Sequence, residues 1–390
     1  MSSQEYLTMM KDIQENILNF LEEEAKSEEN FQHLEDIFNN TKISDNKYNL
    51  LSLLHLICNI ADNYHSFPNF FSKIERILQF FKEDIKTKFS NSEIFNIFKK
   101  NKRILLFLIE QQLIVFDAYV VFKIIHKKFC EAKYPQYFQP EIQPFINEKW
   151  FPKYNPIWND NIWVNEIKKE LPENFYEKRR EGENDNQIIK LIRNDMIEEF
   201  DTYVNQNSGI SLDSKIQPSI YETNPFILKK LKQLKEKEKK EVGLSLIEYA
   251  AFYGSFKIFN YLRVEGVELT PSLWLLAIHG KNSRMIHFLG ENHVELEDKS
   301  YKQIFYEAIK CHHNDIANHF LNNYLKDKEE NSLNTINKCL KYYNFAFLKE
   351  KSINKSSFGI LCKYDYCALA NILMKEKVID INKKEILIFC

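Results

Sequence analysis

One sequence pattern recurs along the second half of the chain and constrains its fold more than any other feature. The stretch AAFYGSFKIFNYL (250–262) is followed by AIHGKNSRMIHFL (277–289), with a small residue, a turn and an apolar run at the same relative positions. A third copy, AIKCHHNDIANHF, begins at 308, so the copies start 27 and 31 residues apart. Internal periods of this length are typical of helix pairs that stack into a solenoid.

Three weaker copies extend this pattern. LIRNDMIEEFDTY (191–203) precedes the clear copies, and CLKYYNFAFL, from Cys339, and LCKYDYCALANIL (361–373) follow them. Each copy predicts a short inner helix, a tight turn and a longer outer helix with apolar residues at helical spacing. The expected fold class is therefore all-α, with a helical solenoid in the second half of the chain.

Small residues at fixed places in the copies indicate how the helices would pack. We expect Ala250, Ala277 and Ala308 to lie where the inner helices of neighbouring copies approach closely, because a larger side chain would push the stack apart. Gly254 falls at the break between two helices, where a residue in the left-handed conformation commonly ends the first helix. This glycine is therefore interpreted as a helix terminator and not as part of a binding site.

The rest of the chain has the composition of a helical protein with a large core. Eight glycines occur in 390 residues, whereas 44% of the residues are hydrophobic, a composition that excludes disorder for most of the length. IERILQFFKEDI (74–85) and DAYVVFKIIHKKF (117–129) repeat apolar residues with the period of a helix. We expect an N-terminal helical region at 1–133 that could hold degenerate repeats, with the acidic stretch 1–25 capping one end of the stack.

Two irregular segments interrupt the helical pattern. Six prolines and three tryptophans fall within 134–183, which we expect to be an extended connector, either an ordered loop or a hinge. The repeat domain, 184–390, contains a Lys/Glu-rich insertion at 228–242. Such charge runs are usually solvated or disordered. The alternative is a basic patch for an acidic partner or RNA, although no aromatic residue is interleaved there for stacking on bases.

The copies resemble the ankyrin repeat, whose pattern runs T-P-L-H-x-A-A-x-x-G-H-x-x-I-V-x-x-L-L-x-x-G-A. The best copy matches at Ser245, Ile247, Ala250, Ala251, Gly254, Ile258, Leu262 and Gly266. The next copy matches at Ser272, Trp274, Ala277 and Leu289. In that second copy, Lys281 and His293 replace the two glycines.

The wider sequence is similar to the divergent, lineage-expanded ankyrin proteins of trichomonad protists that carry a domain of unknown function. The similarity extends into the N-terminal half through LLHLICNIAD (53–62) and FSNSEIFNIFKKNKRILLFLIE (89–110). This resemblance implies an ankyrin-like fold and assigns no activity.

The spacing of the copies bears on where a partner would bind. Periods of 27 and 31 are shorter than the about 33 residues of ankyrin repeats, so the projecting hairpins should be truncated. The concave face of the inner helices is then the expected protein-binding surface. Its outward positions in this register are Glu248, Phe252, Tyr253, Leu276, His279 and Lys310. Exposed aromatic residues would anchor an interface there; the alternative is that Phe252 and Tyr253 pack against the neighbouring copy.

The sequence contains few residues in patterns that carry chemistry. It has no glycine-rich phosphate loop and no H-E-x-x-H, EF-hand or G-x-S-x-G pattern. The best metal-ligand candidates are Cys311, His312, His313 and His319. Consecutive residues on a helix point about 100° apart, so at most two of these could face one ion. We therefore expect no enzyme activity, no cofactor and no metal.

Charge and hydropathy limit the setting and the partners. The net charge of −2 gives no general attraction to nucleic acid or anionic lipid. The N-terminal stretch lacks the features of a signal peptide, and the most apolar stretch, 104–116, is too short and polar to span a bilayer. We expect an intracellular protein, in the cytoplasm or alternatively the nucleus, whose oligomeric state the sequence leaves open.

The expected function is that of a non-catalytic protein–protein interaction module or scaffold, which binds another protein on the concave face of the solenoid. Two alternatives stay open. One is a nucleic-acid-associated regulator that uses the insertion at 228–242. The other is an enzyme with an unrecognised site in the N-terminal half.

Overall fold

The computed structural model of the chain describes residues 1–23, 28–64, 69–125, 133–146, 170–230, 243–296, 301–325 and 332–376. These residues are almost entirely helical, which confirms the predicted all-α class. The one sheet within these ranges is a short antiparallel pairing of β1 (Lys215–Ile216) with β2 (Leu244–Ser245). Of the helices described, none has the length and apolar character needed to cross a lipid bilayer.

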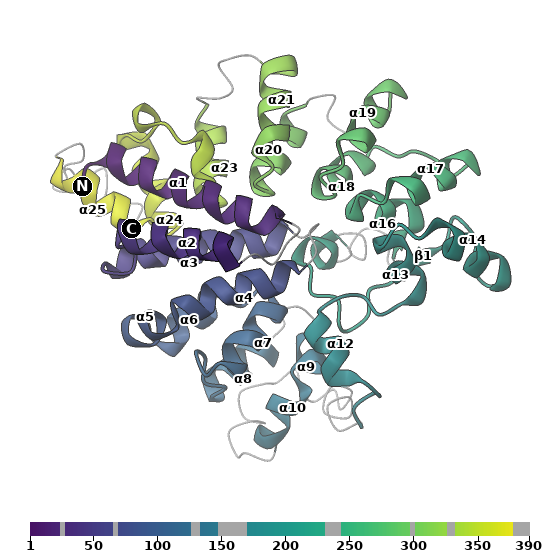
Figure 1. Ribbon diagram of the computed structural model, residues 1–390, viewed down its shortest axis with the longest axis horizontal. Coiled ribbons are helices and arrows are strands. Elements are labelled where there is room, and N and C mark those ends of the chain that lie inside the picture. Colours follow the sequence, from purple (N-terminus) through teal and green to yellow (C-terminus); the bar gives the residue numbers. More distant parts are fainter. Residues whose placement is uncertain are drawn as a thin grey trace. The chain divides into compact units, whose positions relative to one another are not determined.

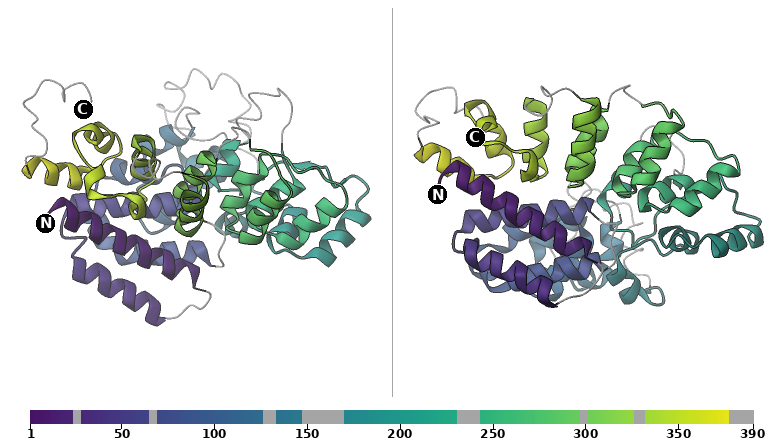
Figure 2. Two further views of the ribbon diagram at one scale, coloured as in Figure 1. Left: turned by 90° about the horizontal axis from the view of Figure 1, so that it is seen from above. Right: turned by 45° about the horizontal axis from the view of Figure 1, so that its top comes forward.

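The chain divides into two compact units, which can be followed by their colours in Figures 1 and 2. Unit 1 combines Met1–Asp84 with Ala250–Cys390, and unit 2 comprises Ile85–Tyr249. The two ends of the sequence thus share one unit, and the middle forms the other. The expected boundaries at 133 and 183 do not coincide with these limits, because the N-terminal helices pack with the C-terminal helix pairs.

Four helices make up the N-terminal part of unit 1: α1 (Ser3–Glu22), α2 (Glu28–Thr41), α3 (Lys47–Asn63) and α4 (Phe70–Phe80). Helix α1 starts with a capping box, in which Ser2 and Glu5 each accept the other's backbone N–H. Asn46 caps α3 in a similar way. The buried stripe of α1 follows helical spacing and consists of Tyr6, Met10, Ile13, Ile17 and Leu21.

A series of helix pairs begins at the boundary between the two units and makes up the C-terminal part of unit 1. The first members are α16 (Leu246–Tyr253), α18 (Leu273–His279), α20 (Lys302–Lys310), α23 (Leu333–Lys341) and α24 (Phe358–Lys363). The second members are α17 (Phe256–Val264), α19 (Ser283–Glu291), α21 (Asn314–Tyr324), the 3-10 turn η3 (Phe345–Phe347) and α25 (Cys367–Lys375). Two further 3-10 turns, η4 (Glu350–Ser352) and η5 (Lys355–Ser357), precede α24.

The same turn joins the two members of each pair. The first or second residue after the first helix of each pair has a positive φ; these residues are Gly254 (72°), Lys281 (47°), His312 (56°), Tyr343 (54°) and Asp365 (59°). Each of these residues donates its N–H to the carbonyl three residues earlier, at 3.3 Å in the case of Gly254 and Ala251. A left-handed residue closes many helices in this way. Gly254 therefore has the predicted left-handed conformation. In the four other pairs, a residue other than glycine adopts this conformation.

The left-handed closure recurs at other helix ends. Gly266 and His293, which stand at equivalent places in the aligned copies, have φ of 92° and 51° and follow α17 and α19. In unit 2, Asp195 (φ 51°) joins α13 (Gln187–Arg193) to α14 (Ile197–Gln206), the pair that corresponds to the copy at 191–203. Local geometry thus repeats at the positions where the sequence repeats.

A buried amide on α1 ties this helix to the turn after α23. Gln14 is 1% exposed, and its Nε2 donates to Asn344 Oδ1 at 3.0 Å. Its Oε1 accepts the backbone N–H of Phe345 at 2.6 Å, and its Nε2 also lies 3.2 Å from His312 Nδ1. One side chain of α1 therefore bonds to residues of two successive pairs.

The contacts of α1 run along the series of pairs. At one end of the helix, Glu22 is paired with Lys281 in the turn after α18. At the other end, the N–H of Ser3 donates to Glu376, next to α25, at 2.8 Å. Figure 2 shows α1 beside the helices of the C-terminal part. The expectation that 1–25 caps one end of the stack is wrong, because this helix contacts the turns of successive pairs instead.

Unit 2 is built of short helices. They include α6 (Asn91–Phe98), α7 (Lys102–Glu110), α8 (Ala118–Ile125), α9 (Tyr134–Tyr137), α10 (Gln139–Ile142), the 3-10 turn η1 (Gln143–Phe145) and α12 (Phe175–Glu181), besides α13 and α14. Helix α5 (Lys82–Lys88) leads from unit 1 into unit 2.

The predicted connector at 134–183 is not extended where it is described, because α9, α10, η1 and α12 occupy its two ends. Three of its prolines stand in the first turn of a helical element: Pro135, Pro140 and Pro144. A proline there sacrifices no hydrogen bond, so these prolines begin helices instead of preventing them. The three tryptophans of the connector, Trp150, Trp158 and Trp163, lie outside the described residues.

Unit 2 buries a carboxyl group together with an amine. Glu222 is 2% exposed and accepts the backbone N–H of Asn224 at 2.8 Å. Burial raises the pKa of Glu222 to about 7, although that bond and nearby Lys102 act in the opposite direction. Lys102 is itself fully buried and donates to the carbonyl of Ile220 at 2.8 Å. The folded state therefore binds a proton at Glu222 more tightly than the unfolded chain does.

Replacing Glu222 with glutamine is expected to stabilise unit 2 at pH 8 and to have little effect at pH 4. Because the pKa of Glu222 is about 7 in the folded state and ordinarily 4.5, wild-type stability falls as pH rises through that window. The gain at pH 8 should be about 3 kcal/mol, measured by urea unfolding at both pH values. Glu177→Gln, at an exposed site of the same unit, is the control. A pH-independent effect of Glu222→Gln would contradict the assignment.

Candidate functional site

Three residues expected to line an open concave face are fully buried: Phe252, Leu276 and His279. The expectation of exposure is wrong for them, because the first helices of successive pairs pack on one another. The ring of Phe252 stacks on the imidazole of His279, with centroids 5.6 Å apart and planes at 29°. Tyr253 is half-buried, with its ring edge-on to Phe252. The alternative interpretation of packing against the neighbouring copy therefore holds for Phe252.

The other two predicted residues are partly exposed and engaged in ion pairs. Glu248 is bonded to Lys230 at 2.8 Å and accepts the N–H of Ser245 at 3.0 Å, which caps α16. Lys310 is paired with Glu307. Lys230 belongs to the Lys/Glu-rich insertion, of which residues 231–242 lie outside the described residues. Of the two described lysines of that insertion, Lys230 is therefore neutralised within the chain, whereas Lys229 is exposed.

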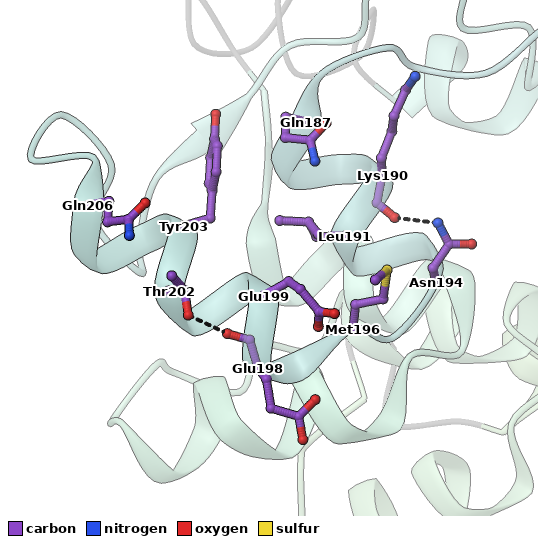
Figure 3. Close-up of a pocket in the computed structure, with 10 residues that line it drawn as sticks. All are labelled: Gln187, Lys190, Leu191, Asn194, Met196, Glu198, Glu199, Thr202, Tyr203 and Gln206. Carbon is purple, nitrogen blue, oxygen red and sulfur yellow. Dashed lines mark hydrogen bonds between the residues drawn. The ribbon is translucent and has the colours of Figure 1, made fainter.

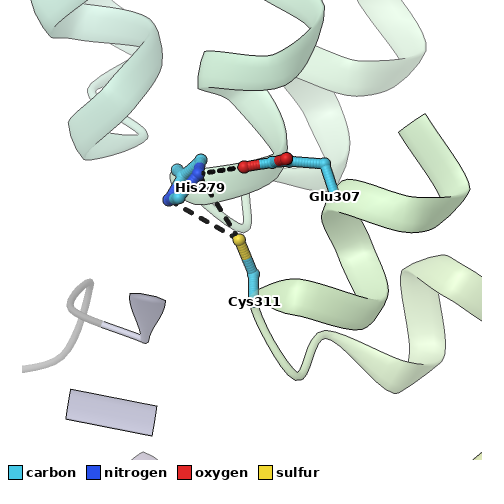
Figure 4. A group of neighbouring side chains, drawn as sticks. All are labelled: His279, Glu307 and Cys311. Carbon is cyan, nitrogen blue, oxygen red and sulfur yellow. Dashed lines mark hydrogen bonds and ion pairs between the residues drawn. The ribbon is translucent and has the colours of Figure 1, made fainter. Parts of the chain in front are cut away.

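The predicted position His279 belongs to a buried cluster with Glu307 and Cys311, drawn in Figure 4. His279 comes from α18, and the other two belong to α20 and its C-cap. His279 Nε2 is 2.7 Å from Glu307 Oε1, and Cys311 Sγ is 3.5 Å from Nδ1 and 3.6 Å from Nε2. A thiol, an imidazole and a carboxylate thus meet, which is the set of groups used by cysteine nucleophiles and by some metal sites.

The two nearly equal distances fix where the sulfur lies. A sulfur that faced one ring nitrogen in the plane of the imidazole would be much further from the other, because the two nitrogens point apart. Sγ of Cys311 therefore lies along the in-plane lone-pair direction of neither ring nitrogen. Because a ring nitrogen accepts a proton along that direction, the thiol is not aligned for proton transfer to the imidazole. The carboxylate of Glu307 is also occupied by Lys310.

Electrostatics keep this thiol protonated. Burial raises the pKa of the Cys311 thiol well above its usual range, and the Glu307 carboxylate adds to this shift. Burial would raise the pKa of Glu307 as well, but Lys310 and His279 hold it well below its usual value. The reactive form of a cysteine is the thiolate, so Cys311 has neither the charge nor the exposure of a nucleophile. The cluster acts as a polar contact between two helix pairs.

Cys311 is expected to react at least about tenfold more slowly with a thiol reagent than Cys367 in the native protein. Cys311 is fully buried, whereas Cys367 is partly exposed. Labelling with iodoacetamide, quenched at intervals and located by mass spectrometry, measures both rates. In denaturant the two rates should become similar. Faster native labelling of Cys311 would mean that the cluster is open to solvent.

The sequence-based metal candidates are separated by the fold. His312 lies against Gln14 of α1, and His313 contacts the ring of Tyr64 with centroids 5.0 Å apart. His319 is exposed on α21. Cys311 alone of the four joins the buried cluster, and its partners His279 and Glu307 come from two different copies. The one signal in the sequence is the spacing of Glu307, Lys310 and Cys311, which lie three and four positions apart and therefore share one face of a helix.

An open depression of about 690 Å³ lies on the α13–α14 pair of unit 2, as Figure 3 shows. Its apolar lining consists of Leu191, Met196 and Tyr203. Its charged lining consists of Lys190, Glu198 and Glu199, and its uncharged polar lining of Gln187, Asn194, Thr202 and Gln206. An apolar floor with a polar rim is the usual make-up of a protein-binding surface.

The turn between α13 and α14 positions the apolar lining. Leu191 is 6% exposed and forms the floor, whereas Met196, next to the left-handed Asp195, is 38% exposed. In Figure 3 Leu191 lies between Tyr203 and Met196, and Glu199 lies close to Met196. The sequence assigned this region to a repeat copy but did not single out these side chains. The signal was an exposed methionine in a turn, outside the apolar stripe of either helix.

Comparison of the chain with protein-family models, with curated protein sequences and with solved structures found no match.

Proposed function

We propose that this protein is a non-catalytic interaction module whose helix pairs form an ankyrin-like solenoid. Five pairs in the C-terminal part share a left-handed closing residue, and the α13–α14 pair of unit 2 has the same closure at Asp195. This shared geometry supports a common repeat. It agrees with the resemblance to the divergent ankyrin proteins of trichomonads, and with a protein that works inside the cell.

The proposed binding surface is the depression on α13–α14 and not the face of the first helices. The observation that carries this choice is the apolar floor beside an exposed Met196. Residues on the first helices are occupied by packing, as Phe252 and His279 are, or by ion pairs, as Glu248 and Lys310 are. Side chains that already have partners within the chain offer little to a second protein.

The test is capture of partners from a native lysate by the purified full chain. Met196→Asp places a charge in the lining of the depression, and Val264→Asp is the control, since Val264 is an exposed apolar residue outside it. We expect specific proteins to be retained by wild type and by Val264→Asp, and lost with Met196→Asp. Melting temperatures of all three establish equal folding.

The same experiment separates the alternative of nucleic-acid binding. Nucleic acid that is retained by Met196→Asp but released by high salt would indicate that the lysines of 228–242 form the binding surface. Binding through phosphate contacts weakens at high salt because it depends on the release of counterions. Proteins retained equally by all variants would rule out the depression as the binding surface.

A further inference from the structure

We infer that the depression on α13–α14 accepts a short amphipathic helix that carries lysine or arginine beside its apolar stripe. This inference rests on the proposed function and specifies the chemistry of the partner. It is argued from the shape of the depression, from its apolar lining and from the charges at its rim.

The shape favours a helix over an extended strand. The depression lies on two packed helices, and an apolar floor between helices is the surface into which amphipathic helices dock. An added strand needs an exposed sheet edge, and neither α13 nor α14 offers one. Met196 adds adaptability, because its flexible thioether adjusts to side chains of different shape. Leucine or phenylalanine at helical spacing would fill the space between Met196 and Tyr203.

The charges at the rim favour a basic partner. Glu198 and Glu199 are both exposed and line the depression. Within the described residues, neither side chain forms an ion pair. Lys190, the cation of the lining, has a carboxylate partner in Glu181 at 4.0 Å. The rim therefore presents two carboxylates that no cation of the described chain neutralises.

The two glutamates also stabilise α14, because carboxylates in the first turn of a helix interact favourably with the helix dipole. That effect does not require them to line a depression with an exposed methionine. Residues adjacent on a helix point about 100° apart, so Glu198 and Glu199 would meet different positions of a bound helix. An acidic segment, a phosphate group or a nucleic acid would be repelled.

The test uses two fluorescein-labelled peptides and the full-length protein. One peptide repeats leucine and lysine at helical spacing, and in the other every lysine is glutamate. Fluorescence anisotropy gives the Kd of each at low salt and at high salt. We expect the lysine peptide to bind at least about tenfold more tightly than the glutamate peptide, and to lose this advantage at high salt.

Two sets of variants decide whether binding occurs at the depression. Glu198→Lys/Glu199→Lys should reverse the preference between the peptides. Met196→Ser should weaken binding of the lysine peptide without changing how its Kd depends on salt. Glu265→Lys/Glu268→Lys makes the same change in net charge at exposed sites in unit 1 and should leave the preference intact. All replaced side chains are at least partly exposed, and circular dichroism checks that each variant is folded.

The outcomes are distinguishable from failure of the proposed function. If the lysine peptide binds wild type and Glu198→Lys/Glu199→Lys equally, or if neither peptide binds wild type, the inference of a basic helix is wrong. A lysate protein that is lost with Met196→Asp would still support a binding surface at the depression. If the charge control abolishes the preference as well, the effect comes from net charge and the inference fails.

Discussion

Replacing Gly280 with alanine is expected to destabilise unit 1 by about 1–3 kcal/mol, although alanine is the better helix residue. Gly280 has φ −68° and ψ −10°, so its backbone suits any residue. The difficulty is space. A Cβ at this position would lie 2.5 Å from the carbonyl oxygen of Ala251 and 2.7 Å from the backbone N of Gly254. Both atoms belong to the backbone of the preceding pair, which must move away to admit a methyl group.

A second glycine in the same unit provides the control for this prediction. Gly290 is exposed in α19, and a Cβ there would lie 3.8 Å from the nearest atom, in the ring of Trp274. Gly290→Ala should therefore be neutral or should stabilise by up to about 1 kcal/mol through helix propensity. Urea unfolding of both variants measures the difference. Equal effects of the two substitutions would show that the close approach at Gly280 does not matter.

Replacing Gln14 with leucine is expected to lower the stability of unit 1 by about 2 kcal/mol, because it leaves one buried N–H without an acceptor and removes a donor from a buried amide oxygen. The backbone N–H of Phe345 loses its acceptor, and Asn344 Oδ1 loses one of its two donors and keeps the N–H of Ala346. Asn344 in turn donates to Ile309 O at 2.9 Å and to Asn314 Oδ1 at 2.8 Å, so the loss extends to the turn after α20.

The matched control for Gln14 is its neighbour Glu15, which is exposed on the same helix. Glu15→Leu makes a similar change in size and polarity and should alter stability by less than about 0.5 kcal/mol. Thermal or urea unfolding of the two variants compares them directly. If Gln14→Leu is as stable as Glu15→Leu, the polar contact does not hold α1 against the helix pairs.

The features of the fold that were predictable from sequence are those set by neighbouring residues. Apolar spacing predicted the helices, and the aligned copies predicted the turn at Gly254 and the burial of Ala250, Ala277 and Ala308. Each of these depends on a few adjacent positions. The exception is local as well: the proline spacing of 134–146 predicts an extended segment, although a proline in the first turn is compatible with a helix.

The features that were not predictable depend on residues far apart in sequence. Gln14 meets Asn344 across 330 positions, and nothing in the sequence near α1 indicates this partner. The close approach that limits packing falls at Gly280 and not only at the alanines, because it depends on how two pairs are seated against each other. Phe252 and His279 lie on the first helices of two successive pairs and stack on each other. The spacing of residues within one copy does not show this contact, so it predicts that both side chains are exposed.

The same limit applies to the candidate site. The copy at 191–203 predicted a helix pair, but a depression is a property of side-chain lengths around a particular turn. Met196 and Tyr203 line it together because the left-handed Asp195 brings α14 back beside α13. The repeat register predicts which side of a single helix a residue occupies, but not which neighbouring helix covers that side.

The division of the sequence between the units has a consequence for synthesis on the ribosome. Helix α1 is translated long before its partners at 312, 344 and 376. The contacts of α1 with α2, α3 and α4, such as that of Tyr6 with Ser52, can form early, whereas the part of α1 that meets the C-terminal pairs must wait until those residues have been made. Unit 2 has all of its residues between 85 and 249 and can fold while the C-terminal pairs are still being added. In the nascent protein unit 2 can therefore be complete before unit 1 is.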